Sequence, residues 1–110
     1  MKKIYVDDVG KGFPLVLVHG YLGSSEMWCH QKDYFSKFCR VIVPALPGFG
    51  ESSNSISFDS IKNMALKILE VLEEKKIEKF NLMGHSMGGM IAQEMTKIAG
   101  SRVNKLICFA

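Results

Sequence analysis

The residues with the clearest chemical potential lie in a glycine-rich segment close to position 85. Gly84, Ser86 and Gly88 form a Gly-x-Ser-x-Gly string between an apolar segment and an expected helix. In a tight turn from strand to helix, the positions two before and two after the apex crowd each other, so only small residues fit there. The apex side chain projects away from the sheet at the positive end of a helix dipole. A serine hydroxyl placed there could attack a substrate carbonyl, which makes Ser86 the candidate nucleophile.

Attack on a carbonyl also requires N–H donors for the negative charge that develops on its oxygen. The backbone N–H of Met87 follows the nucleophile directly and is the first expected donor. A second donor is expected from the loop after an earlier apolar strand, where Gly20 allows a sharp turn that aims the N–H of Tyr21 into the site. Tyr21, Leu22 and Met87 also indicate an apolar substrate-binding surface near Ser86.

Other roles remain open for these polar residues. Ser86 could instead be an ordinary helix N-cap in a glycine turn. His85 is expected to point to a different side of the turn and to pack against neighbours, because it is adjacent to Ser86 in sequence. His19 is expected to brace its loop by hydrogen bonding, and His30 is expected on a helix surface.

The elements that position these residues follow from hydrophobic periodicity. Apolar or β-branched runs predict strands at 4–6, 13–19, 40–43, 80–83 and 103–109, with a turn region at 7–12 and a loop at 44–55. Helical spacing predicts helices at about 25–38, around the apolar stripe 61–72, and at about 87–99, with Gly100 as a C-terminal cap. This alternation indicates an α/β fold, with a mostly parallel sheet and flanking helices. Because ligands bind at the carboxyl ends of parallel strands, His19-Gly20 and the Ser86 turn are expected at one edge of the sheet.

Composition narrows the class of protein. The chain has 110 residues, 47% of them hydrophobic, and a net charge of +3, which fits one domain and argues against disorder and nucleic-acid binding. No apolar run approaches the roughly 20 residues of a membrane span, so no membrane partner is expected. The three cysteines form no CxxC pair and follow no signal peptide, which predicts a reduced, cytoplasmic protein.

No cofactor and no metal are expected. Cys29 and His30 are adjacent and would diverge on a helix, with no second ligand pair to complete a metal site. Dinucleotide binding through the glycine turn is disfavoured, because that fingerprint needs a glycine where Ser86 stands.

Three segments together resemble the α/β-hydrolase superfamily: 15–20 (LVLVHG), 43–52 (VPALPGFGES) and 81–90 (NLMGHSMGGM). The glycine-turn segment is most similar to the branch of small-molecule esterases, thioesterases and carbon–carbon hydrolases. The resemblance implies acyl transfer to water by a Ser-His-acid triad, with Ser86 as nucleophile and Tyr21 and Met87 as oxyanion donors. Ala45 stands where relatives often carry an aspartate that is not a triad member, so only the bracing of that loop is affected.

A larger departure concerns the rest of the triad. In this family the acid and the histidine follow the nucleophile in sequence. After Ser86 the sequence contains one acidic residue, Glu94, within the expected helix, and no histidine. We therefore expect residues 1–110 to be a single partial domain, the N-terminal portion of such a fold, without the lid, the later strands or the triad acid and histidine. Alone it should be nearly inactive towards a small acyl substrate. The alternative is a non-catalytic α/β module that self-associates through an exposed sheet edge or complements another fragment.

Overall fold

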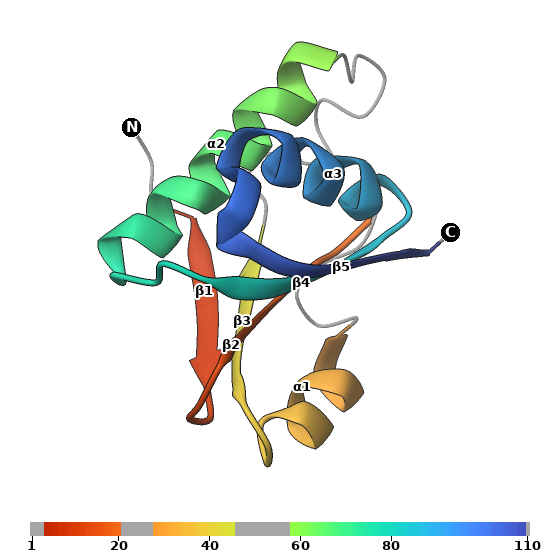
Figure 1. Ribbon diagram of the computed structural model, residues 1–110. Coiled ribbons are helices and arrows are strands. Elements are labelled where there is room, and N and C mark those ends of the chain that lie inside the picture. The colour runs from red at the N-terminus through yellow and green to blue at the C-terminus, as the bar shows by residue number, and fades with distance from the viewer. Residues whose placement is uncertain (1–3, 21–27, 46–57, 110) are drawn as a thin grey trace.

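The computed structural model describes residues 4–20, 28–45 and 58–109 (Figure 1). The elements are, in order, β1 (Tyr5–Val9), β2 (Pro14–Val18), α1 (Cys29–Phe35), β3 (Arg40–Ala45), α2 (Phe58–Glu74), β4 (Phe80–His85), α3 (Met87–Ala99), the short 3₁₀ helix η3 (Gly100–Arg102) and β5 (Val103–Phe109). The helix after the glycine turn and the strand at 103–109 have the predicted bounds. Gly100 ends α3 with φ +62°, which confirms its predicted capping position.

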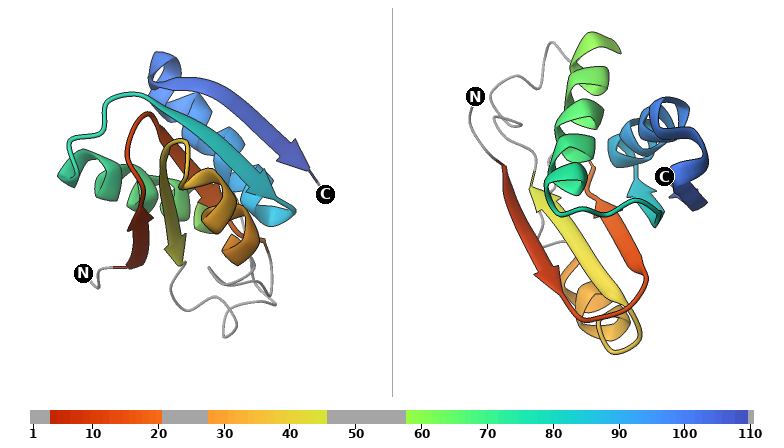
Figure 2. Two further views of the ribbon diagram at one scale, coloured as in Figure 1. Left: turned by 90° about the horizontal axis from the view of Figure 1, so that it is seen from below. Right: turned by 60° about the vertical axis from the view of Figure 1, so that its left-hand side comes forward.

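The strands form one sheet in the order β1-β3-β2-β4-β5. Only β1 is antiparallel to its neighbour, and the three other pairings are parallel. Helices α2 and α3 cover one face of the sheet, and α1 lies on the other (Figures 1 and 2). The predicted α/β architecture, with a mostly parallel sheet and flanking helices, is confirmed.

Two apolar layers hold the helices against the sheet. Because side chains alternate between the faces of a strand, a strand covered on both faces must be apolar throughout. In β2, Val16 and Val18 enter the core under α2 and α3, whereas Leu15 and Leu17 enter the layer under α1. The α2 stripe supplies a large share of the first layer, through Ile61, Ala65, Ile68, Leu69 and Leu72. The continuous apolar run of β2 therefore reflects its position in the sheet.

The predicted turn at 7–12 is wrong at its beginning, because β1 continues to Val9 along β3. Asp8 lies opposite Ile42 and accepts hydrogen bonds from Arg40 Nε at 2.9 Å and Nη2 at 2.7 Å. Lys75 Nζ, at the end of α2, lies 2.8 Å from the same carboxylate. These bonds, above all those from Arg40, lower the pKa of Asp8 from 3.8 to about 2. Charge neutralisation by partners distant in sequence thus allows an aspartate within the strand.

The segment 25–38 also differs from its prediction. Within the described residues α1 covers only Cys29–Phe35, and the chain leaves it in a turn in which the Phe38 N–H donates to the carbonyl of Phe35 at 2.9 Å. Tyr34 and Phe38, whose spacing contributes to the helical pattern of 25–38, are 58% and 69% exposed. At the next loop, Pro44 and Ala45 belong to β3, where pairing with β1 extends the strand by two residues.

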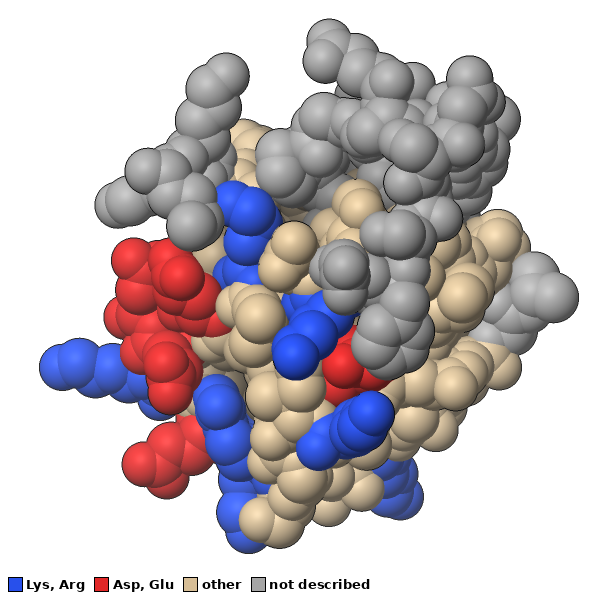
Figure 3. Space-filling view, turned by 90° about the horizontal axis from the view of Figure 1, so that it is seen from above, with Lys and Arg blue, Asp and Glu red and all other residues tan. Residues whose placement is uncertain are grey.

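The surface over α2 and α3 carries charges of both signs (Figure 3). This mixture accords with the small net charge of the sequence, +3. Within the described ranges, none of the helices has the length and apolar character needed to cross a membrane.

Candidate active site

Ser86 occupies the apex of the turn that joins β4 to α3. Its backbone has φ 56° and ψ −121°. Residues other than glycine rarely adopt a positive φ of this size. A conformation of this kind costs about 1–3 kcal/mol and persists only where surrounding packing enforces it. The Ser86 side chain is exposed and makes no capping hydrogen bond to α3. The N-cap interpretation of the hydroxyl therefore has no hydrogen bond to support it.

Glycines on both sides of the apex allow this conformation. A Cβ atom on Gly84 would collide with the carbonyl oxygen of Gly88, and one on Gly88 would collide with the carbonyl oxygen of Val18. The prediction that only small residues fit at both positions is confirmed. The contact between Gly88 and β2 is a second reason why Gly88 must be small, and the Gly-x-Ser-x-Gly string alone does not reveal it.

The end of β2 meets the same turn. A Cβ atom on Gly20 would lie 2.9 Å from Ser86 Cβ and 2.7 Å from the carbonyl oxygen of His85. Next to it, His19 is only 1% exposed, and its Nδ1 lies 3.0 Å from the Gly20 carbonyl oxygen. Because a carbonyl oxygen only accepts, Nδ1 carries the proton in this bond. His19 thus braces the chain where β2 ends, as predicted.

The backbone N–H groups at the start of α3 follow the apex directly. The first N–H groups of a helix have no partner within it, and Met87 is the first residue of α3. The Gly89 N–H donates to the Ser86 carbonyl oxygen at 2.9 Å, which closes the turn. The Met87 side chain is buried in the main core, so its part in a substrate-binding surface stays a prediction. Tyr21 and Leu22 lie outside the described residues.

Of the remaining polar candidates, His85 lies next to the apex, and His30 and Glu94 lie away from it. His85 is partly buried at the end of β4, in register with Phe109 of β5. His30 is exposed on α1, which confirms its prediction. Glu94 is nine-tenths buried on α3, eight residues after Ser86, which corresponds to about 12 Å along a helix. Glu94 is therefore too far along α3 to act on the Ser86 hydroxyl.

We next consider whether the described side chains could hold a metal ion. In the ranges that the structure describes, no group of three or more His, Cys, Asp or Glu residues gathers at one point. All three cysteines are free thiols, with Cys29 and Cys108 exposed and Cys39 partly buried. Burial raises the pKa of the Cys39 thiol, which disfavours its reactive thiolate form.

A family model described as the alpha/beta hydrolase fold matches residues 14–110. This chain therefore belongs to the α/β-hydrolase fold family. The match includes the strands, the glycine turn and the helix that carry Ser86 and its neighbours.

Several characterised proteins are similar in sequence or structure. The dihydrolipoyllysine-residue acetyltransferase component of the acetoin cleaving system of Pseudomonas putida is 35% identical over 90% of this chain and 27% of its own length. The pimeloyl-[acyl-carrier protein] methyl ester esterase of Photobacterium profundum is 34% identical over 92% of this chain and 38% of its own. A thermophilic esterase from Thermogutta terrifontis superposes with a TM-score of 0.85 at 32% identity, over 97% of this chain and 40% of that one. The chain thus spans roughly a quarter to two-fifths of the length of these proteins.

Proposed function

We propose that this chain supplies the nucleophile part of a serine hydrolase that acts on esters, thioesters or related small acyl compounds. The observation that carries the proposal is the backbone of Ser86, held at φ 56° with an exposed side chain that caps no helix. A strained backbone persists only where the surrounding packing enforces it, and such residues cluster at functional sites.

In the proposed reaction, Ser86 Oγ forms a bond to the substrate carbonyl carbon while its proton passes to a base. The carbonyl oxygen becomes an oxyanion that accepts hydrogen bonds from the N–H groups of Met87 and Tyr21. Collapse of this intermediate expels the alcohol or thiol, which takes up the proton, and leaves an acyl-serine that water then hydrolyses. One oxyanion donor is typically worth about 10²–10³ in rate.

The base and the acid are the part of the reaction that these 110 residues do not supply. No histidine follows Ser86 in the sequence, and Glu94 lies about two turns along α3. We propose that the residues form a partial domain and that the histidine and the acid come from outside them. Without a base, a serine hydroxyl is a poor nucleophile at neutral pH, so the isolated chain should be inactive or nearly so.

The substrate class rests on similar proteins. An esterase acting on pimeloyl-[acyl-carrier protein] methyl ester and an esterase from Thermogutta terrifontis are both about one-third identical to this chain. Similarity at this level supports acyl chemistry but leaves the acyl and alcohol groups open. A cytoplasmic location, proposed from cysteine use, is supported by the free thiols at Cys29, Cys39 and Cys108.

Hydrolysis of p-nitrophenyl butyrate tests the proposal in two arms. The chain alone is expected to match its Ser86→Ala variant at the background rate. A chimera that joins residues 1–110 to the remaining part of the Thermogutta terrifontis esterase is expected to hydrolyse the ester, and its Ser86→Ala variant to lose at least about 10³-fold in kcat. A chain that turns over the ester alone would contradict its proposed inactivity. A folded chimera whose activity survives Ser86→Ala would contradict the assignment of the nucleophile.

A second candidate is a non-catalytic module that self-associates. The observation in its favour is β5, whose one strand partner among the described residues is β4 and which exposes Leu106 by 37% and Ile107 by 51%. A strand edge with exposed apolar side chains can pair with another chain.

A further inference from the structure

Glu94 lies in a part of α3 that the proposed reaction does not use. It is 9% exposed, and among the described residues His19 is the other buried polar residue. It takes part in no hydrogen bond or ion pair with the residues that the structure describes. Most of the Glu94 side chain is buried, but its carboxylate oxygens keep some contact with solvent, so an incoming cation can reach them.

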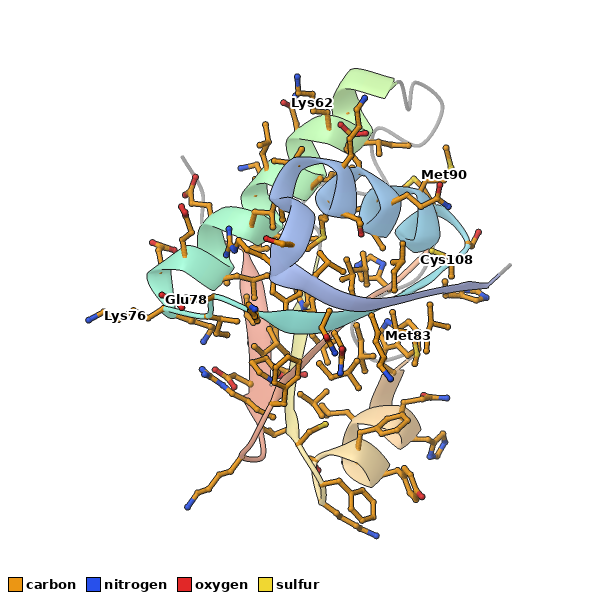
Figure 4. All side chains as sticks on the ribbon, viewed as in Figure 1. Lys62, Lys76, Glu78, Met83, Met90 and Cys108 are labelled. Carbon is orange, nitrogen blue, oxygen red and sulfur yellow. The ribbon has the colours of Figure 1, made fainter. Side chains whose placement is uncertain are left out.

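A pocket opens beside this carboxylate. Its volume is about 290 Å³, near the lower end of ligand-binding pockets, and it is lined by Ile61 of α2 and by Met90, Gln93, Glu94 and Lys97 of α3. Figure 4 shows Met90 on the side of α3 that faces away from the sheet, and its side chain is 55% exposed. The pocket is therefore reached from the outer surface of α3.

The lining has an apolar part, Ile61 and Met90, and a polar part, which comprises Gln93, the acidic Glu94 and the basic Lys97. Ile61 is only 5% exposed, and the flexible thioether of Met90 lies at the mouth, so both suit an aliphatic stem. Gln93 also lines the pocket, and its side-chain nitrogen donates to Cys108 Sγ at 3.9 Å. One carboxylate and one amide are too few oxygen ligands for a calcium or magnesium ion.

We propose that this pocket binds a primary ammonium group on a short alkyl stem, with the ammonium at Glu94 and the stem between Ile61 and Met90. The ammonium would donate a charge-assisted hydrogen bond to this carboxylate, which has no partner among the described residues. Two sources share this chemistry, a free alkylamine and a lysine side chain of a polypeptide. Lys97, at the pocket lining, has an interaction of its own and opposes the bound cation by like charge.

Titrations followed by NMR test the assignment on the 110-residue chain with [methyl-¹³C]methionine. n-Hexylammonium chloride is expected to shift the Met90 methyl and the Gln93 side-chain amide in a saturable manner. n-Hexanol and sodium hexanoate, at equal ionic strength, should not. A blocked Ala-Lys-Ala peptide is the second cationic probe: binding of the peptide points to a lysine side chain, and binding of hexylammonium alone points to a free amine.

Two charge variants are expected to change the affinity for hexylammonium in opposite directions. Glu94→Gln should weaken hexylammonium binding about tenfold, because the amide keeps the shape and removes the charge. Lys97→Gln should strengthen it about threefold, through loss of a like charge near the site. Glu70→Gln, the same change at an exposed position of α2, is the matched control and should bind as the unmodified chain does.

The proposal is overturned if hexanol shifts the same signals as strongly as hexylammonium, or if Glu94→Gln binds as tightly as the unmodified chain. Should Glu94→Gln fail to fold, as judged by its thermal unfolding, the hexanol comparison and Lys97→Gln still decide. No change in Lys97→Gln together with equal shifts by hexanol would mean that water alone solvates Glu94. None of these measurements depends on Ser86 or on catalysis, so they stand apart from the proposed hydrolase activity.

Discussion

Gly20 and Ser86, 66 positions apart in sequence, lie so close that a methyl group on Gly20 would be 2.9 Å from the serine Cβ. This contact brings the end of β2 against the turn between β4 and α3. It places the end of β2 beside the proposed nucleophile. A glycine at position 20 is therefore a packing requirement of the proposed site as well as a turn residue.

Gly88→Ala is expected to destabilise the fold by about 3 kcal/mol, because the added methyl group would collide with the backbone carbonyl of Val18. Urea unfolding measures the change in free energy. Gly100→Ala is the control, since a Cβ there meets nothing within 4 Å and costs only its positive φ, about 1 kcal/mol. Equal losses in the two variants would show that the contact with β2 is unimportant.

Asp8→Asn is expected to lose a stabilisation that depends on pH. The pKa of Asp8 falls from 3.8 to about 2 on folding, so the charged carboxylate stabilises the fold fully above about pH 4 and loses this effect as pH falls to about 2. After allowance for screening by solvent, the effect is about 1 kcal/mol.

The measurement for Asp8 is urea unfolding at several pH values between 2 and 7. The difference between the unmodified chain and Asp8→Asn should be constant above pH 4 and shrink towards pH 2. Asp33→Asn, at an exposed residue of α1, serves as the control for a general loss of negative charge. A difference that stays the same down to pH 2 would contradict the role given to Arg40 and Lys75.

Ile107→Lys is expected to reduce self-association of the 110-residue chain, because a charge on an edge strand disfavours pairing with another chain. Sedimentation velocity over a range of concentrations compares it with Ile98→Lys, a similarly exposed position on α3. If both variants and the unmodified chain are monomeric throughout, the self-associating module has no support.

Periodicity and glycine placement predict the part of the fold that local sequence determines. The helix at 87–99 and the strand at 103–109 are correct because Gly84, Gly88 and Gly100 mark their limits. The helical stripe from Ile61 to Leu72 is correct because it faces one layer of the core.

Predictions were wrong where distant partners determine the structure. Asp8 resembles a turn residue in isolation, yet it lies in β1 because Arg40 and Lys75, 32 and 67 positions away, neutralise it. Tyr34 and Phe38 have helical spacing, but Tyr34 lies on an exposed side of α1 and Phe38 lies beyond its end, so both are exposed. In each case the local sequence pattern does not reveal the surroundings of the residue in the folded chain.

The candidate site shows the same division. The Gly-x-Ser-x-Gly string predicts the turn, and the structure adds the contacts of Gly20 and Gly88 with other elements. The sequence predicts Glu94 in the helix after the nucleophile and indicates no role for it. Its place on the buried face of α3, between the apolar Ile91 and Met95, was the available signal that an acidic side chain interrupts the core.

Fluorophosphonate labelling of the chimera, with the modified residue identified by mass spectrometry, tests the nucleophile most directly. Circular dichroism first establishes that the chimera and its Ser86→Ala variant are folded. The account predicts one phosphonate on Ser86 and none in the variant, with little labelling of the 110-residue chain alone. A folded chimera that leaves Ser86 unmodified, or that carries the phosphonate on another residue, would contradict it.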